Sequence, residues 1–163
     1  MSGRSESSRG VRGGVPRGFT LVELVVVVAI LALLASVAVP RFANSLLRQR
    51  VEAAARRVAA DLELVQRRAR ISGTALVVEF DLEAGGYRVA GLPDPDHPPQ
   101  DYYVPLAEPP YEVELRRVDL EGTTEIAFDG FGQPDRGGSI VVGAGDFEAA
   151  VSVDAATGEV RTP

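Results

Sequence analysis

The chain has 163 residues, 45% of them hydrophobic and 25% charged, a size that suits one modest domain with a further segment. All 17 basic residues are arginines, and 23 acidic residues give a formal net charge of −6, which excludes a general attraction for nucleic acid. There is no cysteine, so a disulfide framework and a thiolate metal site are both excluded.

The first 17 residues are rich in glycine, serine and arginine and contain one acidic residue, Glu6. Such a composition cannot bury a core, and it is typical of a leader. The apolar segment FTLVELVVVVAILALLASVAV follows at residues 19–39, with a single charge at Glu23. As a helix rising 1.5 Å per residue, this segment matches a hydrocarbon core of about 30 Å.

A buried helix of a soluble domain is the alternative for this segment. From Leu24 to Val39 only Ser36 is polar, and a small domain normally hides less apolar surface than that. We therefore expect a membrane-spanning helix. Arginines are similar in number on its two sides, so charge bias does not fix its orientation.

Two ways of processing this N-terminus compete. An ordinary secretory signal could be cleaved after Ala38, where Ser36-Val37-Ala38 offers a small-x-small site. That would release a periplasmic domain. Against it stands Glu23, because a carboxylate inside an apolar run is costly and a signal peptide has no need of one. A costly charge of this kind indicates a partner.

The string RGFTLVELVVVVAILALLASVAVPRF at Arg17–Phe42 resembles the class III signal of type IV pilins and type II secretion pseudopilins. The resemblance implies that prepilin peptidase cuts between Gly18 and Phe19 on the cytoplasmic side and methylates the new amine. It also implies that the apolar helix is both membrane anchor and filament core, in which Glu23 has an assembly role. The chemistry agrees, since Glu23 of a neighbouring subunit can offset the cationic amine in a low-dielectric bundle.

Beyond Pro40 the apolar residues recur every three or four positions, which predicts an amphipathic helix to about Ile71, with Ser72-Gly73 as its stop. Acid and arginine pairs four residues apart favour an exposed face, and we interpret the run Arg67, Arg68 and Arg70 as part of it. The apolar positions are Phe42, Leu46, Leu47, Val51, Ala55, Val58, Leu62, Val65 and Ala69, and the pairs are Glu52 with Arg56, Arg57 with Asp61 and Glu63 with Arg67.

From Thr74 onward the pattern is typical of strands. A hairpin turn is expected at DLEAGG, a long surface loop or an ordered insertion at the proline-rich residues 91–110, and a turn at 154–158. The strands are expected at 74–80, 87–90, 112–118, 125–128, 139–142, 149–153 and 159–161.

These elements predict an α+β fold in which a long N-terminal helix, with a transmembrane half and an amphipathic half, packs on an antiparallel β-sheet in a pilin-like way. The predicted domain organisation is a cleaved leader at residues 1–18, a transmembrane and assembly helix at 19–40, and a periplasmic globular domain at 41–163.

The C-terminal half, with EIAFDGFGQPDRGGSIVV and AAVSVDAATGEVRTP, resembles the GspH/FimT group of minor pilins. The resemblance implies a structural subunit of the type II secretion pseudopilus, anchored once in the inner membrane with its C-terminal domain in the periplasm. Its implied partners are other major and minor pseudopilins, prepilin peptidase, the inner membrane and the secretion platform.

A FimT-like minor pilin for pilus assembly or DNA uptake is the alternative. Such a protein would call for a basic C-terminal motif of the Gly-Arg-x-Arg kind, whereas this chain has Gly158-Glu159-Val160-Arg161. Loss of residues 1–18 removes four arginines and Glu6, which leaves 13 arginines against 22 acids and a net charge of −9. DNA binding is therefore not expected.

The sequence offers little for catalysis. His97 is the only histidine, and no Ser/His/Asp set or phosphate-binding glycine loop is found, so we expect no enzyme activity and no cofactor. Asp94, Asp96 and Asp101 could suggest calcium, but their spacing and the prolines between them do not match a binding loop, so we expect no metal site.

Overall fold

The computed structural model describes residues 18–95 and 97–162, within which one helix, α1 (Leu21–Ser72), precedes eight strands. The chain divides into two compact units, Met1–Pro40 and Arg41–Pro163, and α1 has a part in each. The helix ends where Gly73 takes a positive φ of 65°, a conformation that glycine adopts without steric cost. The predicted helix and its stop are confirmed.

The second part of α1 supplies one wall of the core. Val51, Val58 and Leu62 are almost wholly buried, as the three-to-four spacing predicts. Phe42 and Leu46, predicted for the same apolar face, are instead 75% and 40% exposed. They precede Leu47, where the packing of α1 on the core begins, so no strand covers them.

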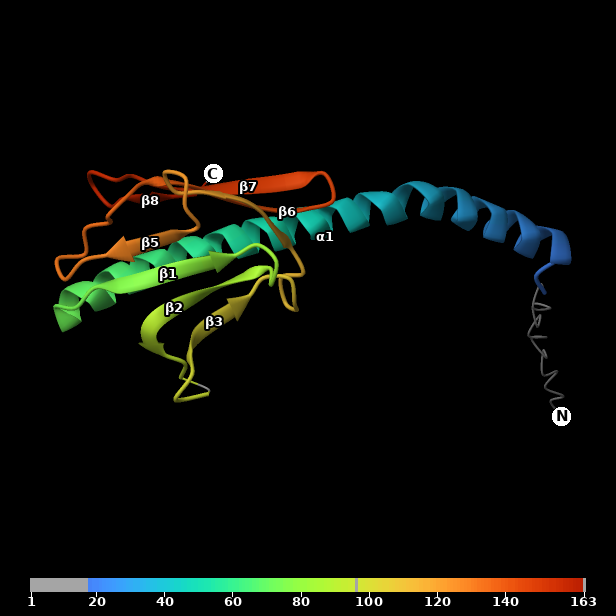
Figure 1. Ribbon diagram of the computed structural model, residues 1–163. Coiled ribbons are helices and arrows are strands. Elements are labelled where there is room, and N and C mark those ends of the chain that lie inside the picture. Colours follow the sequence, from blue (N-terminus) through green and yellow to red (C-terminus); the bar gives the residue numbers. More distant parts are fainter. Residues whose placement is uncertain (1–17, 96, 163) are drawn as a thin grey trace, which may run out of the picture. The chain divides into compact units, whose positions relative to one another are not determined.

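The first sheet contains β1 (Leu76–Asp81), β2 (Gly86–Pro93), β3 (Asp101–Pro105) and β5 (Glu125–Phe128). Its strands are antiparallel in the order β3-β2-β1-β5 (Figure 1). The Asp81 carboxylate starts the β1–β2 turn by accepting hydrogen bonds from the backbone N–H groups of Glu83 and Ala84, both at 2.9 Å. The hairpin predicted at DLEAGG is therefore present.

The second sheet contains β4 (Glu114–Asp119), β6 (Gly138–Ala144), β7 (Phe147–Val153) and β8 (Val160–Arg161), in the antiparallel order β4-β6-β7-β8. The turn between β7 and β8 is fixed by Asp154, whose carboxylate accepts hydrogen bonds from the N–H groups of Ala156 and Thr157. This is the turn expected at 154–158.

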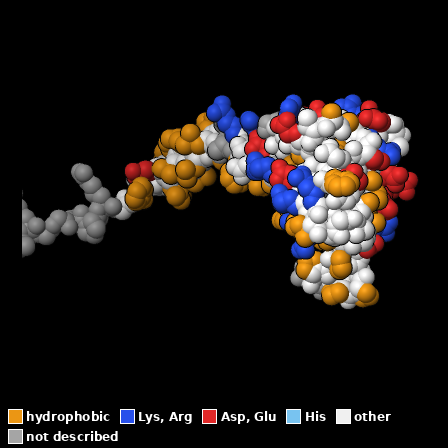
Figure 2. All heavy atoms as spheres, turned by 90° about the vertical axis from the view of Figure 1, so that its left-hand side faces the viewer, with side chains coloured by type: hydrophobic (Ala, Val, Ile, Leu, Met, Phe, Trp, Pro, Cys, Tyr) orange, Lys and Arg blue, Asp and Glu red, His pale blue; other side chains and the backbone are white. Residues whose placement is uncertain are grey.

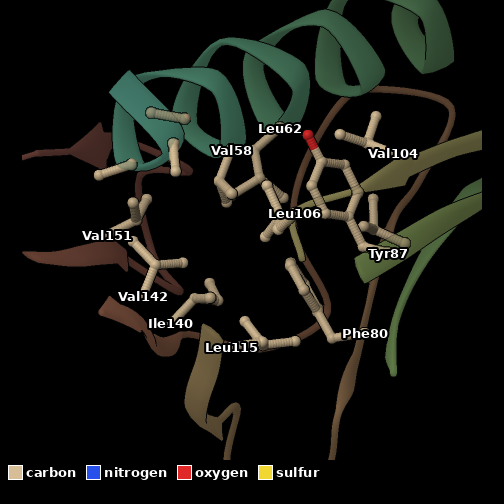
Figure 3. Close-up of a cluster of buried hydrophobic side chains, with 14 of the residues drawn as sticks. Val58, Leu62, Phe80, Tyr87, Val104, Leu106, Leu115, Ile140, Val142 and Val151 are labelled. Atoms are coloured by element: carbon tan, nitrogen blue, oxygen red, sulfur yellow. The ribbon is translucent and has the colours of Figure 1, made fainter. Parts of the chain in front are cut away.

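The core lies where α1 meets both sheets. Figure 3 shows Leu62 from the helix, Phe80 and Tyr87 from the first sheet, and Ile140 and Val151 from the second, all directed into one cluster. Every buried hydrophobic side chain among the described residues lies between Val51 and Val153. Full burial of one large apolar side chain contributes about 1.5–3 kcal/mol, so we expect residues 41–163 to fold without the apolar segment.

The α+β prediction is confirmed, and the strands form two sheets where one was expected. Of the two predictions for residues 91–110, a continuous surface loop does not hold, because β2 continues to Pro93 and Asp101–Pro105 form β3, so the segment is in part an ordered insertion. Pro93 is the last residue of β2 and Pro105 is the last residue of β3, and β3 lies at the edge of its sheet. Proline has no backbone N–H to donate, so it is tolerated at strand ends and on edge strands.

Candidate assembly site

The first described residues of the chain lead directly into α1. Gly18, Phe19 and Thr20 precede the helix, and Phe19 is 80% exposed. The Thr20 hydroxyl accepts a hydrogen bond from the backbone N–H of Glu23 at 3.2 Å, while the Thr20 carbonyl accepts one from Leu24 at 3.1 Å. Thr20 is thus the N-cap, which satisfies donors that a helix start otherwise leaves open.

The sequence analysis missed this role of Thr20. Thr20 and Glu23 have the Thr-x-x-Glu spacing of a capping box, a pattern that could have revealed it. Glu23 lies in the first turn, where the partial positive charge of a helix start favours a carboxylate. Within the described chain its carboxylate forms no ion pair and no side-chain hydrogen bond.

The apolar part of α1 is exposed in the part of its unit that the structure describes. Every residue from Gly18 to Ser36 is exposed, and the helix is long and apolar enough to cross a membrane. Exposed leucines, valines and isoleucines at this density demand a nonpolar environment. Lipid or the helices of neighbouring subunits would provide it.

The globular unit contains a buried polar cluster that the sequence did not reveal. Asp61 was predicted on the exposed face of α1, but it is only 6% exposed. Its carboxylate accepts hydrogen bonds from Arg57 Nε at 2.9 Å, the Tyr87 hydroxyl at 2.6 Å and the Tyr102 hydroxyl at 3.1 Å. Arg57 also donates to the Tyr102 hydroxyl. The cluster therefore joins α1 to β2 and β3.

Burial raises the pKa of Tyr87 far above its usual value, and the Asp61 charge adds to the shift. Tyr102 has a raised pKa for the same reasons, burial first. Both hydroxyls therefore stay protonated and serve as donors to the carboxylate, as a buried acid requires. With three donors directed at Asp61, the arrangement holds α1, β2 and β3 together.

A second polar anchor lies near the end of α1. The buried Gln66 side chain donates from Nε2 to the carbonyl of Gly132 at 2.9 Å and to the carbonyl of Gly158 at 3.3 Å. These two carbonyls belong to the turns after β5 and after β7. One glutamine thus fixes both turns against the helix.

Asp94 and Asp101, two of the acids considered for calcium, each accept a hydrogen bond from a backbone N–H group. The Asp94 carboxylate accepts a hydrogen bond from the His97 N–H at 3.3 Å, and the Asp101 carboxylate accepts one from the Gly91 N–H at 3.2 Å. Asp96 lies outside the described residues. Across 18–95 and 97–162, no three acidic, histidine or cysteine side chains are grouped so as to hold a metal ion.

The C-terminal strand carries the residue relevant to DNA. Arg161 on β8 forms an ion pair with Glu159, with 2.6 Å between the guanidinium nitrogen and the carboxylate oxygen. The Glu159 partner raises the pKa of Arg161 and has its own pKa lowered in return. The single arginine of the Gly-Glu-Val-Arg segment is thus paired with the acid two residues before it.

Two family models match this chain, and each matches residues of a different unit. The model of the prokaryotic N-terminal methylation motif matches residues 16–39, and the model of type II transport protein GspH matches residues 54–157, more than half of the chain. The chain belongs to the GspH family. The comparisons with curated proteins and with solved structures gave no match.

The GspH match begins inside α1 and ends in the turn before β8, so it includes the helix wall of the core and seven strands. The methylation motif covers Gly18, Phe19 and Glu23. Together the two matches make this chain a type IV pilin-like minor pseudopilin and confirm both resemblances seen in the sequence.

Proposed function

We propose that this GspH-family chain is a structural subunit of the type II secretion pseudopilus and supports protein export across the outer membrane. The observation that carries the proposal is the exposed apolar part of α1, which lies within the methylation motif and contains Glu23, a carboxylate without an ion-pair partner among the described residues. A helix of this kind suits a subunit that is stored in a membrane and then packed among other helices.

In this proposal prepilin peptidase cleaves between Gly18 and Phe19 and methylates the Phe19 amine. Residues 19–40 anchor the chain once in the inner membrane, and residues 41–163 form the periplasmic domain. A Cβ atom added at Gly18 would meet nothing within 4 Å, so the fold itself does not demand glycine there. The need for glycine then lies with the peptidase.

Glu23 is proposed to pair with the Phe19 amine of a neighbouring subunit. The amine is largely cationic at neutral pH, and pairing removes the penalty of two isolated charges among apolar helices. The other partners proposed are the major and minor pseudopilins and the secretion platform. We propose a structural part and not an enzyme, because the GspH family to which the chain belongs consists of pilin-like structural proteins.

The experiment is deletion of the gene in its native host, with readouts for both secretion and DNA uptake. We expect a type II secretion substrate to accumulate in the periplasm and to return to the medium when the wild-type chain is restored. Transformation frequency should stay unchanged. Normal secretion with reduced transformation would replace this proposal with the FimT-like alternative.

A further inference from the structure

The first two turns of α1 in the globular unit leave apolar side chains uncovered. Every residue from Arg41 to Leu46 is exposed, and Phe42 and Leu46 themselves are 75% and 40% exposed. These two residues stand four positions apart, so they lie on the same face of the helix. Packing against the core begins only at Leu47. The core of this unit therefore gives no reason for two large apolar residues at these positions.

The same stretch is basic, because no acidic residue occurs between Glu23 and Glu52 whereas arginine occurs at positions 41, 48 and 50. Arg48 and Arg50 have acidic partners within the globular unit. The Arg41 guanidinium has neither an ion pair nor a hydrogen bond in the part of the chain that the structure describes. Figure 2 shows hydrophobic side chains along the exposed part of α1 and basic side chains on the helix beyond them. An exposed face that is apolar and carries an unpaired positive charge suits a membrane surface with anionic headgroups.

The position of Glu23 limits how the apolar segment can lie in a bilayer. A helix needs about 20 residues to cross the hydrocarbon layer. Counted from Phe19, such a span encloses the Glu23 carboxylate, which is costly among lipid chains. Counted from Leu24, it leaves Glu23 in the headgroup layer and ends near Ala43, which is one residue beyond Phe42. The second count is favoured because it keeps the carboxylate hydrated.

We propose that, before assembly, the start of the globular unit lies in the phospholipid surface of the membrane. Phe42 enters the edge of the hydrocarbon layer, Leu46 lies among the headgroups, and the Arg41 guanidinium binds lipid phosphate. A long arginine side chain near the end of a span reaches the headgroups even where its backbone lies in the apolar layer. Phospholipid is the occupant of this face because the face continues an apolar segment that is long enough to cross a membrane.

This inference rests on the membrane anchor of the proposed function and does not depend on secretion. It concerns a single subunit and needs no neighbouring copy. The test therefore uses the full chain alone in vesicles, and its outcome stays separate from the deletion experiment above.

The chain contains no tryptophan, so one introduced tryptophan is a specific probe of lipid contact. The chain with Phe42→Trp or Leu46→Trp is reconstituted at low density in vesicles of phosphatidylcholine and phosphatidylglycerol whose acyl chains carry bromine, a quencher of tryptophan fluorescence. We expect both tryptophans to be quenched several-fold more than that of Ile71→Trp, a control that is 80% exposed in the last turn of α1. Leu31→Trp, inside the apolar segment, reports on the anchor itself.

The four positions separate the two ideas. Quenching of Leu31→Trp together with quenching of Phe42→Trp and Leu46→Trp no greater than that of Ile71→Trp would overturn this inference and leave the anchor intact. An unquenched Leu31→Trp would overturn both.

The contact with headgroups is tested by Arg41→Glu in the Phe42→Trp chain. Because the change replaces attraction to anionic headgroups with repulsion, quenching should fall by about two-fold or more in vesicles that contain phosphatidylglycerol, and less in pure phosphatidylcholine. Arg70→Glu, the same change in the last turn of α1, is the matched control and should leave quenching unchanged. Equal quenching with and without Arg41→Glu would show that Arg41 does not bind lipid phosphate.

Discussion

Two acidic residues on the same helix show how environment decides the role of a side chain. Asp61 is buried and receives three hydrogen bonds from its own chain, whereas the exposed Glu23 receives none at its carboxylate within the described residues. A charge in an apolar segment has a high desolvation cost unless it is paired. Asp61 thus acts within the fold, and we assign Glu23 to contacts between subunits.

The first prediction concerns Glu23→Leu. Because it removes the only charge of the apolar segment, membrane insertion should be unchanged or improved, while incorporation with partner pseudopilins should fall. Co-purification from detergent-solubilised membranes measures this, with Glu23→Asp as the control that keeps the charge. Equal recovery of Glu23→Leu and wild type would contradict an assembly role.

Gly18 provides the second prediction. Gly18→Val adds a side chain where the fold has open space, so the helix should form normally while the peptidase is blocked. Full-length precursor should then accumulate, detected as a larger band in membranes and by N-terminal sequencing. A mature chain beginning at Phe19 in this variant would show the cleavage assignment to be wrong, and one beginning at Val39 would indicate ordinary signal processing.

A third prediction compares two acids that each pair with an arginine four residues away. Asp61→Ala in the fragment 41–163 should lower the free energy of unfolding by about 2 kcal/mol or more, because the buried Tyr87 hydroxyl and the half-buried Tyr102 hydroxyl lose a charged acceptor. Glu63→Ala breaks only the exposed pair with Arg67 and should cost roughly 0–1 kcal/mol. Urea denaturation measures both. Equal losses would mean that the buried cluster adds nothing to stability.

At the scale of elements, α1 packs against both sheets. Gln66 connects it to two turns that lie far apart in the sequence. Gln66→Leu keeps the side chain's size but leaves the Gly132 and Gly158 carbonyls without this donor, which should cost about 2 kcal/mol. The exposed Gln133→Leu should change stability by less than about 0.5 kcal/mol. Denaturation midpoints that shift equally would contradict the anchoring role.

Some of these elements were predicted correctly from the sequence and others were not, and the difference has physical reasons. Helix α1 was predictable because its apolar periodicity is long and Gly73 marks its end. β5 was predicted at its observed bounds, because more buried and more exposed residues alternate along it and turn residues lie on both sides. β3 was missed because edge position, which permits its flanking prolines, is a property of the assembled sheet. The division into two sheets depends on the same long-range pairing.

The site was predictable only where local sequence defines it. Phe19 and Glu23 belong to a contiguous motif, and the Thr20 cap follows a four-residue pattern. Asp61 was misplaced because its spacing from Arg57 suits an exposed pair, while its burial comes from Tyr87 and Tyr102 on distant strands. Such convergence has no signature in a single sequence.

At the scale of the whole molecule, the two units differ in the exposure of their apolar side chains and in their number of charges. The first exposes apolar side chains, and the second holds the buried core and most of the charge. Residues 41–163 contain 13 arginines and 21 acids, which gives a formal charge of −8. A strongly acidic domain repels nucleic acid unless its arginines are clustered and unpaired.

The last prediction therefore concerns duplex DNA and the fragment 41–163. Arg161 is already paired with Glu159, so we expect no measurable shift in an electrophoretic assay at about 150 mM salt. Even basic proteins bind DNA non-specifically with dissociation constants of only roughly 10⁻⁴–10⁻⁶ M under such conditions. Glu159→Arg, which creates the Gly-Arg-Val-Arg sequence, is the matched gain-of-charge control. Micromolar, salt-sensitive binding by the wild-type fragment that weakens with Arg161→Ala would favour DNA uptake over secretion.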